Sequence, residues 1–239
     1  MSTRASSASQ SLRIARAPLV SRLIGKAMAW GYRLVGKDRY DDYRLERISG
    51  SPFLVTPSVF NPKVPRTGEF LASILDSKTV CRDFSVLDMG TGSGVCAVFA
   101  AKHAARVVAV DINPAAVRCA CINVLLNHME DKVEVRQGDL FAAVPREQFD
   151  LILFNPPFLR GTPDDDRDRA WRSSDVAERF AAGLSGVLKP AGFALVLLST
   201  FGDAGHFLEQ FYRAGLRVSV LAERRFVNET LTIFKLQRS

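Results

Sequence analysis

The most specific cluster of chemistry-bearing residues is Asn155-Pro-Pro-Phe158, which directly follows the mostly apolar segment Phe149–Phe154. Two consecutive prolines remove backbone N–H donors and stiffen the chain. The side-chain oxygen of Asn155 and the carbonyl of Pro156 can then accept both hydrogens of one NH2 group, while Phe158 offers a flat face for stacking. A rigid turn without a chemical role is the alternative. The pattern favours a site that holds a planar amide or amine nitrogen.

A glycine-rich segment, Val86-Leu-Asp-Met-Gly-Thr-Gly-Ser-Gly94, lies between a predicted strand and a predicted helix. Glycine permits a tight turn and the close approach of a ligand to bare backbone. The spacing is G-x-G-x-G preceded by Asp88, which differs from the G-x-G-x-x-G of dinucleotide-binding proteins. We expect Asp88 and the backbone of 90–94 to contact the polar part of a ligand. A packed corner is the alternative interpretation.

A second acidic residue, Asp111, ends the next predicted strand, 21 residues after Gly90. An acid at this spacing accepts hydrogen bonds from ribose hydroxyls. It could also cap the helix that begins near Pro114, and both roles can hold at once. With the glycine turn upstream, the spacing favours ribose binding.

A third acidic position follows the third predicted strand, in Gly138-Asp-Leu-Phe141. Asp139 could accept a hydrogen bond from an exocyclic adenine amine, while Leu140 packs on the ring. A simple turn is the alternative. Together the three motifs describe a pocket for an adenosine-bearing ligand beside the nitrogen-binding tetrapeptide.

The elements that must position these motifs alternate along the chain from residue 84 onward. Strands alternating with helices at this spacing predict a parallel sheet covered on both faces, with the ligand at the carboxyl ends of the strands. The predicted strands are Ser85–Met89, Arg106–Asp111, Lys132–Gln137, Phe149–Phe154, Phe193–Ser199, Arg217–Ala222 and Thr230–Leu236. The predicted helices are Val95–Ala105, Pro114–His128, Asp175–Leu188 and Asp203–Ala214, after a short helix over 68–77 and a proline-rich stretch over 52–68 that could hold a hairpin.

The first part of the chain has a different character. The 239 residues carry a net charge of +7, yet residues 1–37 hold seven basic residues and no acidic one, so the remainder is neutral. We predict a basic extension over 1–50, with a helix over 19–36, and one domain over 51–239. The extension is a frayed terminus, a mitochondrial transit peptide, or a surface helix that contacts nucleic acid or an anionic surface. No apolar run reaches the roughly 18 residues that a membrane span needs.

The four cysteines are too few for a disulfide scaffold, and none forms a C-x-x-C pair. With three scattered histidines the sequence shows no zinc pattern, so we expect no metal. A reducing cytoplasm is the expected compartment, and a mitochondrial location is the alternative if residues 1–28 are a transit peptide.

These motifs together resemble those of class I S-adenosylmethionine (SAM) methyltransferases that carry an Asn/Asp-Pro-Pro-Tyr/Phe tetrapeptide. Within them the chain is similar to the HemK/PrmC group and the small-domain methyltransferases over residues 52–238. The glycine segment nearly matches that group's cofactor loop, 64–71 is similar to its P-R-x-x-T-E segment, and 228–235 looks like the end of the short HemK-type enzymes. Phe158 replaces the Tyr usual in the glutamine enzymes and is more usual in guanine-N2 enzymes. The acidic loop over 162–169 is a further departure.

The resemblance implies a Rossmann-like sheet of seven strands, mostly parallel, with the last strand antiparallel, and SAM as the cofactor. It implies methyl transfer to a planar nitrogen, with a protein glutamine as the leading substrate and a translation factor as the candidate partner. The alternatives are an exocyclic base amine of RNA or DNA, then a small-molecule amine, and last a non-catalytic binding module. The catalytic residues implied are Asn155, Pro156, Pro157 and Phe158. The cofactor-binding residues implied are Thr67, Asp88, Gly90, Thr91, Gly92, Gly94, Asp111, Ile112, Asp139, Leu140 and Asn155.

Overall fold

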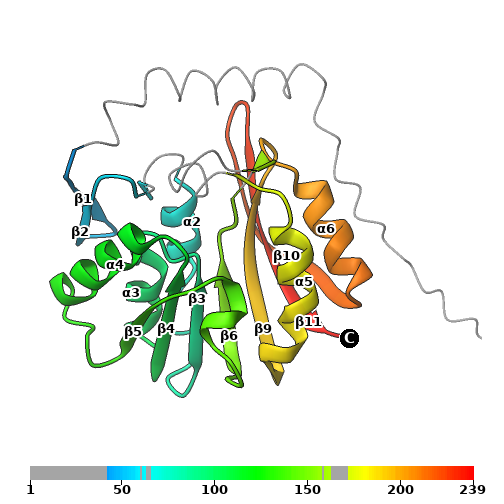
Figure 1. Ribbon diagram of the computed structural model, residues 1–239, viewed down its shortest axis with the longest axis horizontal. Helices are drawn as coiled ribbons and strands as arrows, with labels where there is room; N and C mark the ends of the chain where they lie inside the picture. The colour runs from blue at the N-terminus through cyan, green and yellow to red at the C-terminus, as the bar shows by residue number, and fades with distance from the viewer. Residues whose placement is uncertain (1–41, 60, 63–65, 158, 163–171) are drawn as a thin grey trace, which may run out of the picture.

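The computed structural model describes residues 42–59, 61–62, 66–157, 159–162 and 172–239. Its centre is a seven-stranded sheet with the order β10-β11-β9-β6-β3-β4-β5 (Figure 1). The strands are β3 (Ser85–Met89), β4 (Arg106–Asp111), β5 (Val133–Gln137), β6 (Phe149–Phe154), β9 (Leu188–Ser199), β10 (Leu216–Arg225) and β11 (Thr230–Arg238). The neighbours from β9 to β5 are parallel, whereas β11 runs antiparallel between β9 and β10. The predicted sheet with an antiparallel last strand is therefore confirmed.

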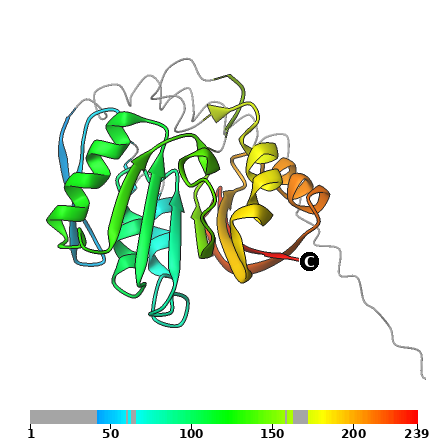
Figure 2. The same cartoon turned by 60° about the horizontal axis from the view of Figure 1, so that its bottom comes forward.

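Helices cover both faces of this sheet. The helices are α2 (Thr67–Ser73), α3 (Val95–Ala101), α4 (Pro114–Leu126), α5 (Val176–Val187) and α6 (Ala204–Arg213), with a short 3-10 helix η2 (Leu140–Ala143). Side chains that alternate along each strand point to opposite faces. Val86 packs with α2 and α3 on one face, whereas its neighbour Leu87 packs with α5 and α6 on the other. Figure 2 shows α5 and α6 together at one end of the sheet.

A small hairpin precedes the sheet. Its strands β1 (Arg44–Ile48) and β2 (Ser51–Val55) pair antiparallel, and β2 lies beside α4 (Figure 2). Asn123 of α4 joins them, because its Oδ1 accepts from the backbone N–H of Leu54 and its Nδ2 donates to the Leu54 carbonyl. The hairpin spans residue 50, the predicted boundary between the extension and the domain. Strand β1 before this boundary pairs with strand β2 after it. The division of the chain at residue 50 stays a prediction.

Several predicted boundaries differ from the structure. The helix expected over Val95–Ala105 ends at Ala101, and the strand expected from Phe193 begins at Leu188. A further two-stranded parallel ribbon follows the tetrapeptide, formed by β7 (Leu159–Arg160) and β8 (Arg172–Ser173). The predicted helix over 19–36, the residue Phe158 and most of the acidic loop lie outside the described residues.

The topology fixes the place of the site. From β3 the chain adds β4 and β5 on one side and then returns with β6 on the other side of β3. In open α/β sheets, ligands bind beyond the carboxyl ends of the strands at such a reversal. The strand ends carry the four predicted motifs, because Met89 pairs with Val110 and Phe154, and Asp111 pairs with Gln137.

Candidate cofactor and substrate site

The glycine turn leaves β3 in a conformation that L side chains rarely adopt. Gly90, Gly92 and Gly94 have φ angles of 66°, 57° and 81°. The turn is tied to the neighbouring strand because the Thr91 N–H donates to the Val110 carbonyl at 2.9 Å. At Gly94, which caps α3, a Cβ would lie 3.2 Å from both Cα and Cβ of Ala120. A Cβ at Gly94 would therefore crowd α4 unless Ala120 shifted, whereas a Cβ at Gly92 would meet no atom within 4 Å.

The side chain of Asp88 holds this turn through hydrogen bonds. Its carboxyl group is buried, and its Oδ2 accepts from Thr91 Oγ1 at 2.6 Å and from the Ala97 N–H at 3.0 Å. Burial raises the pKa of Asp88 to about 7, although both hydrogen bonds oppose the rise. These contacts join the turn to the first turn of α3. The expected role of Asp88 toward the cofactor stays a prediction, since the bonds to the protein give it a structural role as well.

Asp111 holds the other side of the turn. Its Oδ2 accepts from the Gly92 N–H and its Oδ1 from the Asn113 N–H, both at 2.9 Å. Burial raises the pKa of this carboxyl group. Each oxygen keeps further lone-pair capacity, which is what hydrogen bonds from two ribose hydroxyls require. The helix cap considered for Asp111 belongs instead to Asn113, whose Oδ1 accepts from the Ala115 N–H at 2.8 Å.

The tetrapeptide presents an acceptor that lacks a partner. The Nδ2 of Asn155 donates to Thr67 Oγ1 at 3.2 Å, and Thr67 is fully buried at the start of α2. The Oδ1 of Asn155 is buried and has no hydrogen-bond partner among the described residues. A buried polar oxygen without a partner costs free energy unless a ligand satisfies it. Asn155 is thus oriented by Thr67 so that its oxygen is free to accept a hydrogen.

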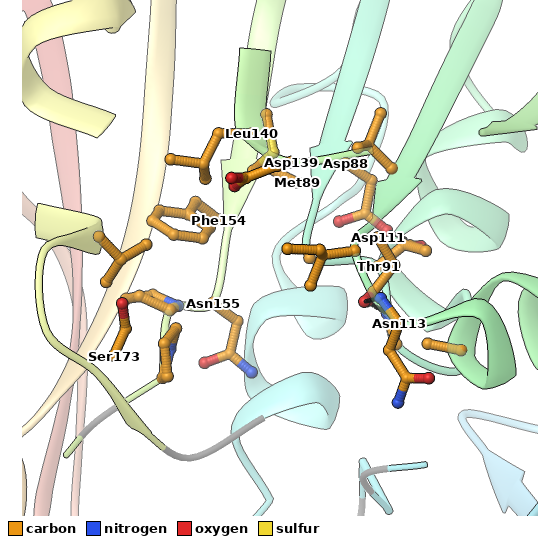
Figure 3. A pocket seen from close by; sticks show the side chains of 18 of the residues that line it. Asp88, Met89, Thr91, Asp111, Asn113, Asp139, Leu140, Phe154, Asn155 and Ser173 are labelled. Atoms are coloured by element: carbon orange, nitrogen blue, oxygen red, sulfur yellow. Dashed lines mark hydrogen bonds between the residues drawn. The ribbon is translucent and has the colours of Figure 1, made fainter. Parts of the chain in front are cut away.

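These strand ends enclose a cavity of about 380 Å³. Figure 3 shows Asp88, Thr91, Asp111 and Asn155 grouped around it. The predicted residues that line it are Asp88, Gly90, Thr91, Gly92, Asp111, Ile112, Asp139, Leu140, Asn155, Pro156 and Pro157. Two predicted cofactor-binding residues do not line the cavity. Thr67 contacts Asn155 instead, and Gly94 packs on α4.

Sequence reasoning missed part of the lining. Met89 and Phe154 are the last residues of β3 and β6, a position that the strand pattern alone could have indicated. A further group of lining residues lies far in the sequence from the predicted motifs, and no local pattern marks these residues as part of a site. They are Ser58, Val59, Pro62 and Gly68 before and in α2, and Arg172, Ser173, Ser174, Asp175, Val176 and Arg179 around the start of α5.

The chemistry of the lining fits an adenosine-bearing cofactor. A turn of bare glycine backbone lies beside a carboxylate with free lone pairs, and Asn155, whose Oδ1 has no partner among the described residues, lines the same cavity (Figure 3). Within the described residues, no group of three His, Cys, Asp or Glu side chains is placed to hold a metal ion. Nor is any described helix both long and apolar enough to cross a membrane.

The comparisons with known proteins agree with this geometry. The family model for the methyltransferase small domain matches residues 51–225. The chain belongs to this family. It is 33% identical over 188 residues to the release factor glutamine methyltransferase of Koribacter versatilis, covering 66% of each chain. It is 28% identical over 200 residues to a Methanocaldococcus jannaschii protein, provisionally named a protein N5-glutamine methyltransferase, covering 80% of this chain and 98% of that one.

A solved structure supports the fold. The E. cuniculi Mtq2–Trm112 complex, described as responsible for methylation of the termination factor eRF1, has a TM-score of 0.56 at 22% identity, covering 76% of this chain and 99% of that one. Against the release factor enzymes the chain spans less, between 44% and 66% of their length. Membership of the family confirms the expected cofactor type, SAM, as the one that this class of fold uses.

Proposed function

We propose that this chain is a SAM-dependent N-methyltransferase that modifies the side-chain nitrogen of a protein glutamine. The observation that carries the proposal is the buried Oδ1 of Asn155, which has no hydrogen-bond partner among the described residues and whose side chain is held by Thr67. The names of the relatives from Koribacter and Methanocaldococcus support glutamine as the substrate, and the Koribacter name, a release factor enzyme, supports a translation factor as the partner.

The cofactor would lie along the glycine turn. Asp111 would accept from its ribose hydroxyls, Asp139 and Leu140 would hold its adenine, and the backbone of 90–94 would contact its methionine part. When bound, SAM supplies an electrophilic methyl group. The rest of the mechanism concerns how this chain's own residues orient the nitrogen that accepts it.

An amide nitrogen is a poor nucleophile because resonance draws its lone pair into the carbonyl group. Asn155 Oδ1 and the Pro156 carbonyl would accept the two hydrogens of the NH2 group. These bonds fix the direction of the lone pair and stabilise the positive charge that develops on nitrogen. The proline pair contributes by offering no competing N–H donors at this position. No strong general base is needed, because the proton can leave after methyl transfer.

The test uses labelled SAM and a cell lysate that supplies the candidate substrates. Purified chain and labelled SAM are incubated with a lysate of the source cells, and the product is separated into protein, nucleic acid and small molecules. We expect label in protease-sensitive material as N5-methylglutamine, and none with Asn155→Ala. Asn155→Ala must still bind S-adenosylhomocysteine (SAH), which shows that its cavity is intact. Normal turnover by this variant would refute the mechanism.

An exocyclic base amine of RNA or DNA remains the second candidate. It is favoured by Phe158, the residue more usual in guanine-N2 enzymes, and by the basic residues of 1–37. We infer that the extension over 1–50 contacts nucleic acid or an anionic surface and that the protein acts in the cytoplasm. Deleting residues 1–40 should then lower heparin affinity without changing SAH binding. An N-terminus cleaved in the source cell would favour the mitochondrial alternative.

A further inference from the structure

One ion pair lies at the rim of the cavity, where the expected adenine position meets α5. Arg179 Nη2 lies 2.6 Å from Asp139 Oδ2 and forms a hydrogen bond with it. Both residues line the cavity. The other oxygen, Asp139 Oδ1, has no hydrogen-bond partner among the residues that the structure describes. One carboxylate oxygen is therefore held while the other is available to a ligand.

The backbone that carries this pair is fixed by close packing. Asp139 begins η2, and Arg179 lies in the first turn of α5. One turn further along α5, a Cβ on Gly183 would lie 2.5 Å from the Phe141 ring, so no larger residue fits without a shift. Phe141 also packs on Phe180, with ring centroids 5.4 Å apart. The elements that carry the two charged residues, η2 and α5, are thus packed together by an aromatic contact between Phe141 and Phe180.

The pair contributes little to folding stability. The side chains of Arg179 and Asp139 are 45% and 44% exposed, and solvent-exposed ion pairs add on the order of 0–1 kcal/mol. Arg179 Nη1 also lies 3.8 Å from Asp175 Oδ1, which keeps the guanidinium between two carboxylates. A side chain with this freedom would otherwise adopt several rotamers. The orientation of the Arg179 side chain therefore matters chiefly because it fixes the Asp139 carboxylate at the rim of the cavity.

We propose that Arg179 is a positioning residue for adenine recognition: it holds Asp139 so that Oδ1 accepts the exocyclic amine of the cofactor. This inference rests on the proposed function, since it assumes an adenosine-bearing cofactor. By fixing the carboxylate before binding, Arg179 removes the ordering cost that a free Asp139 would incur. A carboxylate offers only acceptors, which suits the N–H donors of the amine.

The test compares two ligands by calorimetry, without catalysis. SAH carries the 6-amino group, and S-inosylhomocysteine carries a carbonyl oxygen in its place. The wild-type chain should bind SAH more tightly. Arg179→Ala should weaken SAH binding on the order of fivefold and S-inosylhomocysteine binding much less. The preference of the chain for SAH over S-inosylhomocysteine should therefore become smaller. Arg179→Lys should restore part of the preference, because it keeps the charge near Asp139.

Two further variants separate positioning from general effects. Arg213→Ala removes another exposed arginine paired at 2.6 Å, with Glu209 on α6, and should leave both affinities unchanged. In an Asp139→Ala background, Arg179→Ala should have no further effect. An equal loss for both ligands, or no loss at all, would overturn the inference while leaving the proposed function intact. Absence of SAH binding by the wild-type chain would overturn both.

Discussion

Thr67→Val separates the positioning of Asn155 from the binding of the cofactor. Valine fills nearly the same space as threonine but offers no acceptor to Asn155 Nδ2, which lies 3.2 Å from Thr67 Oγ1. An ordinary hydrogen bond contributes about 1 kcal/mol, and leaving its buried partner unsatisfied costs about 1–3 kcal/mol. Because this bond is long and Asn155 is only half-buried, we take the lower end, which corresponds to about a fivefold loss of kcat.

The assay measures kcat, KM for SAM and SAH affinity side by side. Thr67 does not line the cavity, so SAH affinity should stay constant while kcat and kcat/KM fall together. Thr232→Val is the matched control, since Thr232 is buried in β11 at 9% exposure and does not line the cavity. A loss of SAH affinity with unchanged kcat would refute the reasoning and favour the direct cofactor contact that the resemblance implies for Thr67.

Two other variants test how the glycine turn is held. Gly94→Ala and Gly92→Ala both force alanine to a positive φ, but only at Gly94 does the new Cβ crowd Ala120, so Gly94→Ala should be less stable by about 1 kcal/mol in urea unfolding. Asp88→Asn should gain stability relative to wild type as the pH rises. The folded pKa of Asp88 is about 7 against an ordinary value of 3.8, so between these values folding holds a proton that the unfolded chain has lost, and the wild-type chain loses stability with rising pH. Urea unfolding at several pH values between 4 and 8 measures this difference, and a difference independent of pH would show that Asp88 is ionised in the folded chain.

The sequence predicted the strands that carry the site because their signals are local. Ser85–Met89, Arg106–Asp111 and Phe149–Phe154 are short, mostly apolar segments, and the structure has the same bounds. The polar residues after these segments lie at one edge because parallel strands end on the same side. The strand ends therefore predicted the part of the cavity lining that they carry.

Contacts between distant segments could not be predicted in this way. Thr67 and Asn155 are 88 residues apart, and nothing in either local sequence indicates their hydrogen bond. Arg179 lies in a segment that the sequence predicted only as a helix, and its pairing with Asp139 depends on how α5 packs on η2. The helix cap considered as an alternative role for Asp111 belongs to Asn113. Both residues closely precede Pro114, and only the backbone geometry distinguishes them.

The central claim is that Asn155 binds the nitrogen that becomes methylated. The most direct measurement is transfer of labelled methyl from SAM to the protein fraction of a lysate, with wild type and Asn155→Ala compared at equal SAM occupancy. The account predicts N5-methylglutamine in protease-sensitive material for wild type and a loss of at least about 100-fold for the variant. Label in nuclease-sensitive material, or equal transfer by both proteins, would contradict it.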